Sequence, residues 1–547
     1  MGARTMQMKK TDNRSYGNQF LSGVAVLALS TVIVKIIGLF YKIPMMAYLG
    51  AEGMGYFNSA YEIYSLFFVI ATTGIPVAIS ILVSENLTQK RTENIKKIFR
   101  ISLITLGALG LIGTLIMAMF HSQFAKLINN DAAAYSILAI SPTLLLVCLS
   151  SAIRGYFQGN QSMVPTAVSQ VIEALGKLLL GLAFAVIAIN KGYSMVEAAA
   201  FAVLGLTIGV LISLLYLILC KILHRIRYNK ETTLVSCVDS SDKIIKQIFS
   251  IAIPITLSST ILSLNKLIDM TMILGRLNAI GYSQNAANSI YGAYSTMAVS
   301  VYNLPSTLVT AIALPLVPML TSAIEVSESK KEQSIISSSL KLTALISFPA
   351  GIGISVFSKE ILSLLFSAQT EEIEYIAPLL SLLGISIFLS SMITITNAIL
   401  QAYKQVNKPI ISMILGVVVK FILSFVLIGI PSINIYGAPI STFFSTLVIV
   451  AINLYFIIKN SGRINSISQI FIKPFIAAFV SVMFGLGIYL FLSDIIDSKI
   501  FILGIIGFVS LIYLVAIVKL KAIEKEEILM LPKGESLIKI LTKIHLV

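Results

Sequence analysis

The chain has 547 residues, of which 57% are hydrophobic and 12% charged, and its formal net charge is +15. An ordinary soluble domain is about 45–50% apolar and about 25% charged. This composition excludes a water-soluble globule and indicates a membrane protein.

Long apolar segments follow one another along nearly the whole chain. About 20 apolar residues are enough to cross the hydrocarbon core as a helix, and a membrane β-barrel would require alternating segments instead. We therefore predict an all-α polytopic protein of about fourteen transmembrane helices. In chain order the expected spans are 22–48, 60–83, 99–120, 133–156, 165–189, 196–220, 247–275, 288–320, 339–358, 374–401, 408–430, 436–458, 470–492 and 500–519.

The basic residues are unevenly distributed between the two sets of connections. Most of the 40 Lys and Arg lie in the N-terminal lead, in the connections after even-numbered spans and in the C-terminal tail. The opposite connections hold few: Lys126, Lys191, Arg276, Lys359 and Lys499. The positive-inside rule then places both termini in the cytoplasm, in the cytoplasmic (inner) membrane. The positive charge is thus explained by topology, and no nucleic-acid partner is expected. The full-length first span argues against a cleavable signal peptide.

The chain also contains an internal repeat. Residues 154–160 (RGYFQGN), Pro165 and Lys177 are echoed by residues 401–407 (QAYKQVN), Pro409 and Lys420, and shorter echoes relate Lys35 to Lys266 and Pro76 to Pro305. This pattern predicts two six-helix lobes related by a pseudo-two-fold axis along the membrane normal, with the substrate path between them. The expected organisation is a cytoplasmic lead 1–20, an N-lobe 21–222, a basic linker 223–246, a C-lobe 247–458, two accessory spans within 459–519 and an amphipathic cytoplasmic tail 520–547.

Several ionisable side chains lie inside predicted spans. They are Lys35, Lys42, Glu62, Glu173, Lys177, Lys266, Asp269 and Lys420. Each charge at the centre of a span costs about 2.5–3.5 kcal/mol on insertion scales. Each therefore requires a partner, a water-filled cavity or a functional role.

Their spacing favours specific pairings. Lys35 and Lys42, seven residues apart, lie on one helix face at two depths and would suit a diphosphate, with Glu62 able to approach one of them; alternatively Lys42 snorkels outward. Glu173 and Lys177 are four residues apart, in the favourable order for an ion pair.

Three charged residues have less obvious partners. Asp269 lies three residues after Lys266 and either pairs with it or binds a coupling cation. Lys420 has no acid within reach in its own span. Arg154, at the predicted cytoplasmic end of the fourth span, is either a topology anchor or a guanidinium that captures a phosphate.

Catalytic and metal-binding motifs are not expected from this sequence. Three Cys and three His show no ligand spacing, and no HExxH, GxSxG or Walker motif occurs. We expect no enzyme activity, metal or cofactor, and energy from the membrane potential, a Na⁺ or H⁺ gradient or product consumption.

Two stretches resemble a known family. Residues 50–85, with GAEGMG, AYEIY, TGIPVAIS and VSE, and residues 154–173, with RGYFQG and PTAVSQVIE, are similar to the SpoVB/YtgP group of polysaccharide-export proteins. That group belongs to the multidrug/oligosaccharidyl-lipid/polysaccharide (MOP) flippase superfamily and includes relatives of the lipid II flippase MurJ. The resemblance implies a two-lobed cavity, alternating access and an undecaprenyl-diphosphate-linked sugar as substrate.

The resemblance also implies site residues. Lys35 matches the family's first-span cation, Lys42 is a shifted equivalent of the next one, and Asp269 matches an acid that helps to bind sodium in some members. The chain departs from Gram-negative MurJ proteins around residues 67–69 and 295–300, where arginines are missing, and Lys420 stands where an acid would complete a sodium site.

The leading hypothesis is a monomeric flippase for a lipid-linked cell-wall glycan precursor, with lipid II as first candidate. Its head group would contact Lys35, Lys42, Arg154, Lys177, Lys266 and Lys420, with Glu62, Glu173 and Asp269 for charge pairing or ion coupling. The alternatives are a cation or drug antiporter of the multidrug branch and a non-transporting scaffold for wall or spore-cortex assembly. A cavity for cations should be acidic, whereas lysines outnumber acids here.

Overall fold

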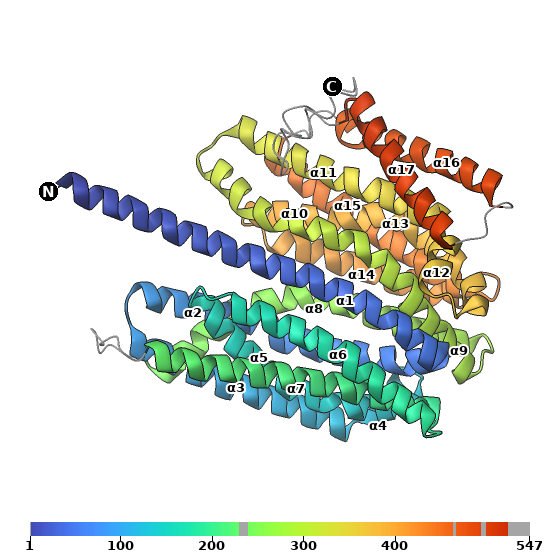
Figure 1. The fold of residues 1–547 in the computed structure, drawn as a ribbon, viewed down its shortest axis with the longest axis horizontal. Coiled ribbons are helices and arrows are strands. Elements are labelled where there is room, and N and C mark those ends of the chain that lie inside the picture. Colours follow the sequence, from blue (N-terminus) through green and yellow to red (C-terminus); the bar gives the residue numbers. More distant parts are fainter. Residues whose placement is uncertain (1, 229–238, 463–466, 494–498, 523–547) are drawn as a thin grey trace. The chain divides into compact units, whose positions relative to one another are not determined.

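A computed structural model describes residues 2–228, 239–462, 467–493 and 499–522. Every regular element within these ranges is a helix (Figure 1), and 13 helices are long and apolar enough to cross a membrane. The predicted all-α polytopic fold is confirmed, while a total of fourteen spans stays a prediction. Nearly all of the predicted amphipathic tail, residues 523–547, lies outside the described residues.

Helix α1 (Gly2–Thr72) contains the first predicted span and the first half of the second, which continues after Thr73. The candidate membrane segment Leu29–Thr88 has 60 residues, which would make about 90 Å of continuous helix against about 30 Å of hydrocarbon core. The direction changes at Gly50, whose φ of 62° lies in the left-handed region that glycine adopts without strain. The predicted polar connection at residues 49–59 is thus helical apart from this one residue.

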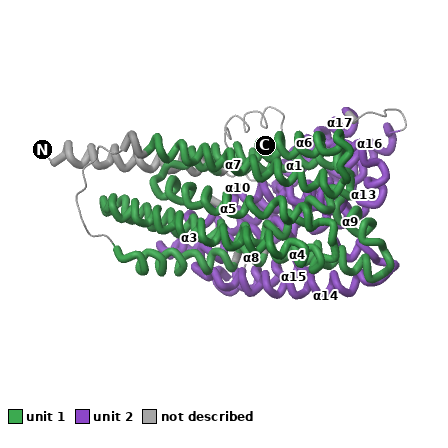
Figure 2. The backbone as a smooth tube through the Cα atoms, turned by 90° about the horizontal axis from the view of Figure 1, so that it is seen from below, with its two compact units in different colours: residues 1–292 green, residues 293–547 purple. Residues whose placement is uncertain are grey.

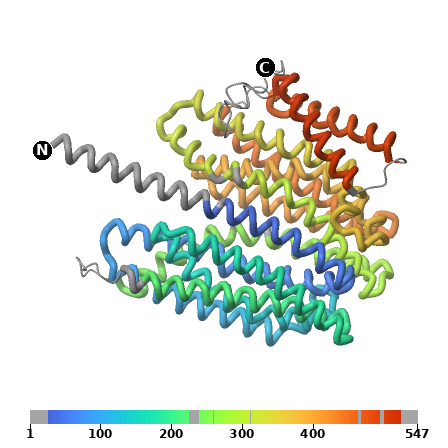
Figure 3. Tube along the Cα trace, in the orientation of Figure 1, coloured from blue at the N-terminus to red at the C-terminus, as the bar shows by residue number. Residues whose placement is uncertain are grey.

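Seven further α-helices belong to the first half of the chain. They are α2 (Gly74–Thr88), α3 (Thr92–Met119), α4 (His121–Leu127), α5 (Ala134–Gly159), α6 (Val164–Asn190), α7 (Met195–Tyr228) and α8 (Ser241–Ala279). The short α9 (Gln284–Ala293) follows α8 and leads into the second half. Figure 3 traces the chain through these helices.

The second half continues with membrane-length helices and short connecting ones. Its main elements are α10 (Val299–Glu325), α11 (Ser329–Val356), α12 (Ser358–Leu365), α13 (Thr370–Ala402), α14 (Asn407–Ile428), α15 (Gly437–Ser461), α16 (Lys473–Leu492) and α17 (Lys499–Lys519). Buried residues of α10, α11, α13 and α15 form one apolar core there. The predicted accessory spans correspond to α16 and α17, which contact each other.

The chain forms two compact units, residues 1–292 and 293–547 (Figure 2). Helix α8 was expected to open the C-lobe at residue 247, but it packs against α1 and α2 and belongs to unit 1. Gly74 explains part of this packing, because a Cβ there would collide with the Ala252 carbonyl oxygen and the Thr256 hydroxyl of α8. The boundary between the compact units therefore follows helix packing, not the boundary between the sequence repeats.

The internal repeat is visible in the backbone of each unit. Gln161 and Lys404, 243 residues apart, both have φ near 60° directly after a helix end, and their N–H groups donate to Gln158 and Gln401. Helices α3 and α11 have the same 28-residue length and begin 237 residues apart. The structural repeat thus pairs Arg154 with Asn397. The sequence echo paired Arg154 with Gln401, four residues further along the chain. It followed identical residue types and could not take the position of the helix end into account.

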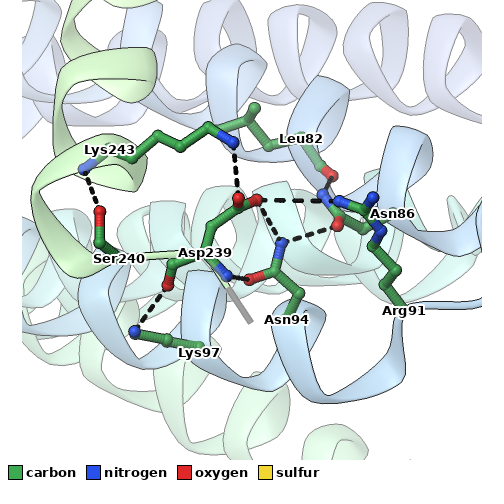
Figure 4. Close-up of polar contacts among 8 residues, drawn as sticks. All are labelled: Leu82, Asn86, Arg91, Asn94, Lys97, Asp239, Ser240 and Lys243. Carbon is green, nitrogen blue, oxygen red and sulfur yellow. Dashed lines mark hydrogen bonds and ion pairs between the residues drawn. The ribbon is translucent and has the colours of Figure 1, made fainter. Parts of the chain in front are cut away.

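A polar cluster around Asp239 fixes the beginning of α8 (Figure 4). The Asp239 carboxylate accepts from Lys243 Nζ at 2.6 Å and from Asn94 Nδ2 at 3.0 Å, and Arg91 lies 4.0 Å away. Lys97 Nζ donates to the Asp239 carbonyl at 2.7 Å. We call these five residues the Asp239 cluster. It ties the last part of the predicted basic linker to the connection between α2 and α3.

Candidate functional site: a lysine- and tyrosine-lined cavity in unit 1

Unit 1 contains a cavity of about 400 Å³. Side chains of α1, α6, α7 and α8 line it: Tyr61, Tyr64, Ser65, Phe68, Val69, Glu173, Lys177, Leu206, Ser259, Ser263 and Lys266. The lining therefore combines two ammonium groups and one carboxylate with hydroxyls and aromatic rings.

Helical periodicity explains why these residues meet. Tyr61, Tyr64, Ser65 and Phe68 recur every three or four residues, so one face of α1 points into the cavity. The pair Glu173 and Lys177 follows the same rule on α6, as do Ser259, Ser263 and Lys266 on α8. The charged members were predicted from the sequence, whereas the tyrosines and serines were not, although their spacing on one helix face was a usable signal.

Aromatic side chains form a ladder along this face of α1. Phe57 and Tyr61 are stacked with ring centroids 6.2 Å apart, Tyr61 and Tyr64 are 5.9 Å apart, and Tyr64 and Phe68 are 5.6 Å apart. Lys177 Nζ lies 4.6 Å from the Tyr61 ring centroid and donates to its hydroxyl at 3.4 Å. The ring and hydroxyl of Tyr61 thus position the Lys177 ammonium by a cation–π contact and a hydrogen bond.

Glu173 pairs with Arg154 of α5 and not with Lys177 as the four-residue spacing suggested. Arg154 Nη2 lies 2.9 Å from Glu173 Oε2, and both side chains are largely buried. Arg154 also donates through Nε to Ser169 Oγ at 2.9 Å and through Nη2 to Ser213 Oγ at 3.3 Å. The predicted intrahelical pair is wrong because a guanidinium on the neighbouring helix offers the carboxylate a closer, planar partner.

The first-span lysines lie near the same group of charges. Lys42 and Glu62 are half-buried, and Glu62 acts electrostatically on both Lys42 and Lys266. One carboxylate oxygen of Glu62 is buried and accepts no hydrogen bond from the described residues. Lys35 is exposed and within electrostatic range of Lys266. In unit 1, the charges of Lys35, Lys42, Lys177 and Lys266 therefore lie close enough to influence one another.

Six of the nine predicted site residues are absent from the cavity lining: Lys35, Lys42, Glu62, Arg154, Asp269 and Lys420. Asp269 is half-buried on α8, one turn beyond Lys266. Lys420 lies on α14 in unit 2 and is only 6% exposed. Lys341 of α11, near the start of the expected span 339–358 and not among the predicted site residues, is buried to a similar degree at 5% exposure. Unit 2 therefore buries two lysines of its own.

Across the described ranges, no group of three or more His, Cys, Asp or Glu side chains is arranged to hold a metal ion. Binding of a coupling ion at Asp269 stays a prediction.

Comparison with known proteins identifies the family. The family model described as "Polysaccharide biosynthesis protein" matches residues 20–324, more than half of the chain. The chain belongs to this family. Two relatives come from Bacillus subtilis (strain 168): "Stage V sporulation protein B", 26% identical over 94% of this chain and 98% of that protein, and "Lipid II flippase MurJ", 28% identical over 75% and 78%. The resemblance inferred from the sequence is thereby confirmed.

Two solved structures share the fold of this chain. "Lipid II flippase MurJ, inward closed conformation" superposes with a TM-score of 0.67 at 16% identity, covering 90% of this chain and 98% of that one. An inward-facing multidrug resistance MATE transporter of the MOP superfamily gives 0.62 at 16% identity, covering 81% and 100%. The fold of this chain is therefore shared by a protein named as a lipid II flippase and by a drug transporter.

Proposed function

We propose that this protein is a flippase that moves an undecaprenyl-diphosphate-linked cell-wall glycan precursor, with lipid II as first candidate, from the inner to the outer leaflet by alternating access. The observation that carries the proposal is the lysine- and tyrosine-lined cavity of unit 1. Ammonium groups inside a membrane protein suit the diphosphate of a lipid-linked sugar.

The charge balance around the cavity favours an anionic substrate. The intramembrane charges of unit 1 are five cations and three acids: Lys35, Lys42, Arg154, Lys177 and Lys266 against Glu62, Glu173 and Asp269. One of the acids, Glu173, is already paired with Arg154. An antiporter for cationic drugs would need the opposite excess, so the resemblance to MATE transporters supports the fold and not that substrate. A non-transporting scaffold would leave the cavity lysines without a function.

The names of the relatives support the same substrate class. One relative is named as a lipid II flippase and another as a stage V sporulation protein, and both align with most of this chain. We therefore propose a role in peptidoglycan assembly, with sporulation as one setting.

The remaining parts of the proposal follow from the sequence. Both termini lie in the cytoplasm of a bacterial inner-membrane protein, as the positive-inside distribution predicts. A single chain is sufficient, because the cavity is built within unit 1. No cofactor takes part. If a Na⁺ or H⁺ gradient drives transport, Asp269 is the acid that binds the ion.

The test is reconstitution of the purified protein with a fluorescent undecaprenyl-diphosphate disaccharide in sealed vesicles. Exposure of the labelled head group to an impermeant quencher reports flipping. We expect Lys177→Gln and Lys266→Gln to reduce the flipping rate at least about tenfold, since each removes an ionic contact with the diphosphate. The matched control, Lys191→Gln, changes an exposed lysine outside the cavity and should keep the wild-type rate.

The outcomes separate the candidate functions. Wild-type flipping with loss in both cavity variants supports the proposal. Absence of flipping by the wild-type protein, together with uptake of a cationic dye, would replace it with drug export. Absence of both activities would favour the scaffold.

A further inference from the structure

Arg154 is joined to the cavity lining by its ion pair with Glu173. The guanidinium lies on α5 and is absent from the cavity lining, whereas Glu173 of α6 is part of it. Arg154 donates to the Glu173 carboxylate and to the hydroxyls of Ser169 and Ser213. The Ser213 hydroxyl in turn donates to the Ser169 carbonyl at 2.8 Å. Arg154 is thus held in the wall formed by α5, α6 and α7, behind the acid.

The second repeat shows the same position without either charge. At the 243-residue spacing, Arg154 corresponds to Asn397 and Glu173 to Gly416, while Lys177 corresponds to Lys420. Neither the guanidinium nor the carboxylate is therefore present at the equivalent positions 397 and 416, although the lysine is present in both units.

A neutral network replaces the ion pair in unit 2. Ser412, the equivalent of Ser169, donates to Asn453 Oδ1 at 2.6 Å, and Asn453 Nδ2 donates to Asn397 Oδ1 at 2.8 Å. Ser169 and Ser412 also donate to equivalent carbonyls, those of Thr166 and Pro409. The helix packing at this site is therefore compatible with two uncharged residues, provided that both charges are removed together.

We infer that Arg154 is a positioning residue that neutralises Glu173 and does not itself bind the substrate. This inference rests on the proposed function, because it concerns how the cavity attracts a diphosphate. An unpaired carboxylate in the lining would repel the anion, and the low dielectric of the interior would strengthen that repulsion. With Arg154 paired to it, Glu173 remains part of the cavity lining and the pair adds no net charge.

The test is the affinity of the detergent-solubilised full chain for inorganic pyrophosphate. Arg154→Gln exposes the acid and should weaken binding about tenfold, whereas Glu173→Gln leaves an additional cation and should tighten it severalfold. The double variant has the same net charge as the wild type and should bind within about twofold of it. High salt should shrink the differences of the two single variants from the wild type.

A merely structural ion pair predicts a different pattern. Breaking it from either side would weaken binding and lower the melting temperature together, so tighter binding by Glu173→Gln excludes that explanation. If Arg154 bound the phosphate directly, Glu173→Gln would not rescue Arg154→Gln, and this result would overturn the inference. The double variant and Glu173→Gln keep the test decisive if Arg154→Gln fails to fold.

Two controls complete the design. Lys359→Gln breaks an exposed ion pair with Glu374, 2.7 Å long in the wild type, and should leave pyrophosphate affinity unchanged. If the wild-type protein binds no pyrophosphate, the proposed diphosphate substrate fails, and the inference fails with it. If the wild type binds but the double variant is as weak as Arg154→Gln, only the inference fails.

Discussion

Substituting Gly205 with Ala should loosen the contact between α6 and α7, which form two walls of the cavity. The two helices cross at glycines, with Gly205 facing Gly181 and Gly209 facing Gly176. Close backbone approach at small residues is a common way for membrane helices to associate. A Cβ at Gly205 would lie 2.5 Å from the Leu180 carbonyl carbon and oxygen and from the Gly181 nitrogen, all main-chain atoms that cannot rotate away.

The expected size of the effect follows from this geometry. Overpacking of a filled site destabilises by about 1–3 kcal/mol, and rigid backbone neighbours place Gly205 at the upper end. Replacing a helical glycine with alanine stabilises by about 1 kcal/mol. The net loss is therefore about 2 kcal/mol, which for a chain of this length lowers the melting temperature by about 2 °C.

The assay is thermal unfolding in detergent followed by far-UV circular dichroism, because the chain has no Trp to report on unfolding. The matched control is Gly353→Ala in α11, where a Cβ would meet nothing within 4 Å. It should melt at or slightly above the wild-type temperature. If Gly205→Ala melted at or above the temperature of this control, the argument from close packing would be refuted.

Three further predictions concern single side chains. Asn288 accepts a hydrogen bond from Asn130 Nδ2 at 2.7 Å and donates one to the Glu52 carbonyl at 2.8 Å. Asn288→Ala should therefore lower the free energy of unfolding by about 2–4 kcal/mol in the same melting assay. The control is Asn303→Ala, which changes an exposed asparagine. The hydrogen bond from Lys243 lowers the pKa of Asp239 below its ordinary 3.8, as do the Asn94 amide and the Lys243 and Arg91 charges. Asp239→Asn should therefore lower the free energy of unfolding by about 1 kcal/mol at neutral pH. This loss stays constant down to about pH 4 and disappears as the pH falls through the lowered pKa. A melting-temperature gap that widened toward acid would contradict this sign. Finally, Tyr61→Leu removes the ring and hydroxyl that hold Lys177 and should slow flipping severalfold, while Tyr61→Phe keeps the ring and most of the rate; equal rates in the two variants would show that the ring plays no part.

Much of the fold could be predicted from the sequence, because lipid requires continuous apolar helices and each span is a local feature. The conformation of the connection at Gly50 could not be predicted, because residues 49–59 include polar and glycine residues that suggest a loop. Only the backbone shows a helix interrupted at one residue. The assignment of α8 to unit 1 also depends on tertiary contacts, such as that of Gly74 with Ala252, that have no local signal.

The candidate site was predictable in its charges and not in its pairings. Lys177 and Lys266 were identified because charge inside a span is costly, and both do line the cavity. The partner of Glu173 was misjudged, because sequence spacing measures neighbours on one helix and Arg154 comes from another. The tyrosines were overlooked because aromatic residues are common in membrane spans. Only the three-dimensional structure shows that those of the α1 ladder face a cavity.

The left-handed backbone conformation of Gly50, within a helix that continues on both sides, limits where this protein can be tagged. An epitope inserted there would interrupt α1 between two packed spans, with no loop to absorb it. Gly192 offers the alternative: it also has positive φ, its Cβ position is open, and it lies with exposed neighbours in the short connection between α6 and α7. Exposed loop tips of this kind tolerate insertions best. An epitope at Gly192 on intact cells would then be recognised by an external antibody if that connection lies outside, as the distribution of basic residues predicts.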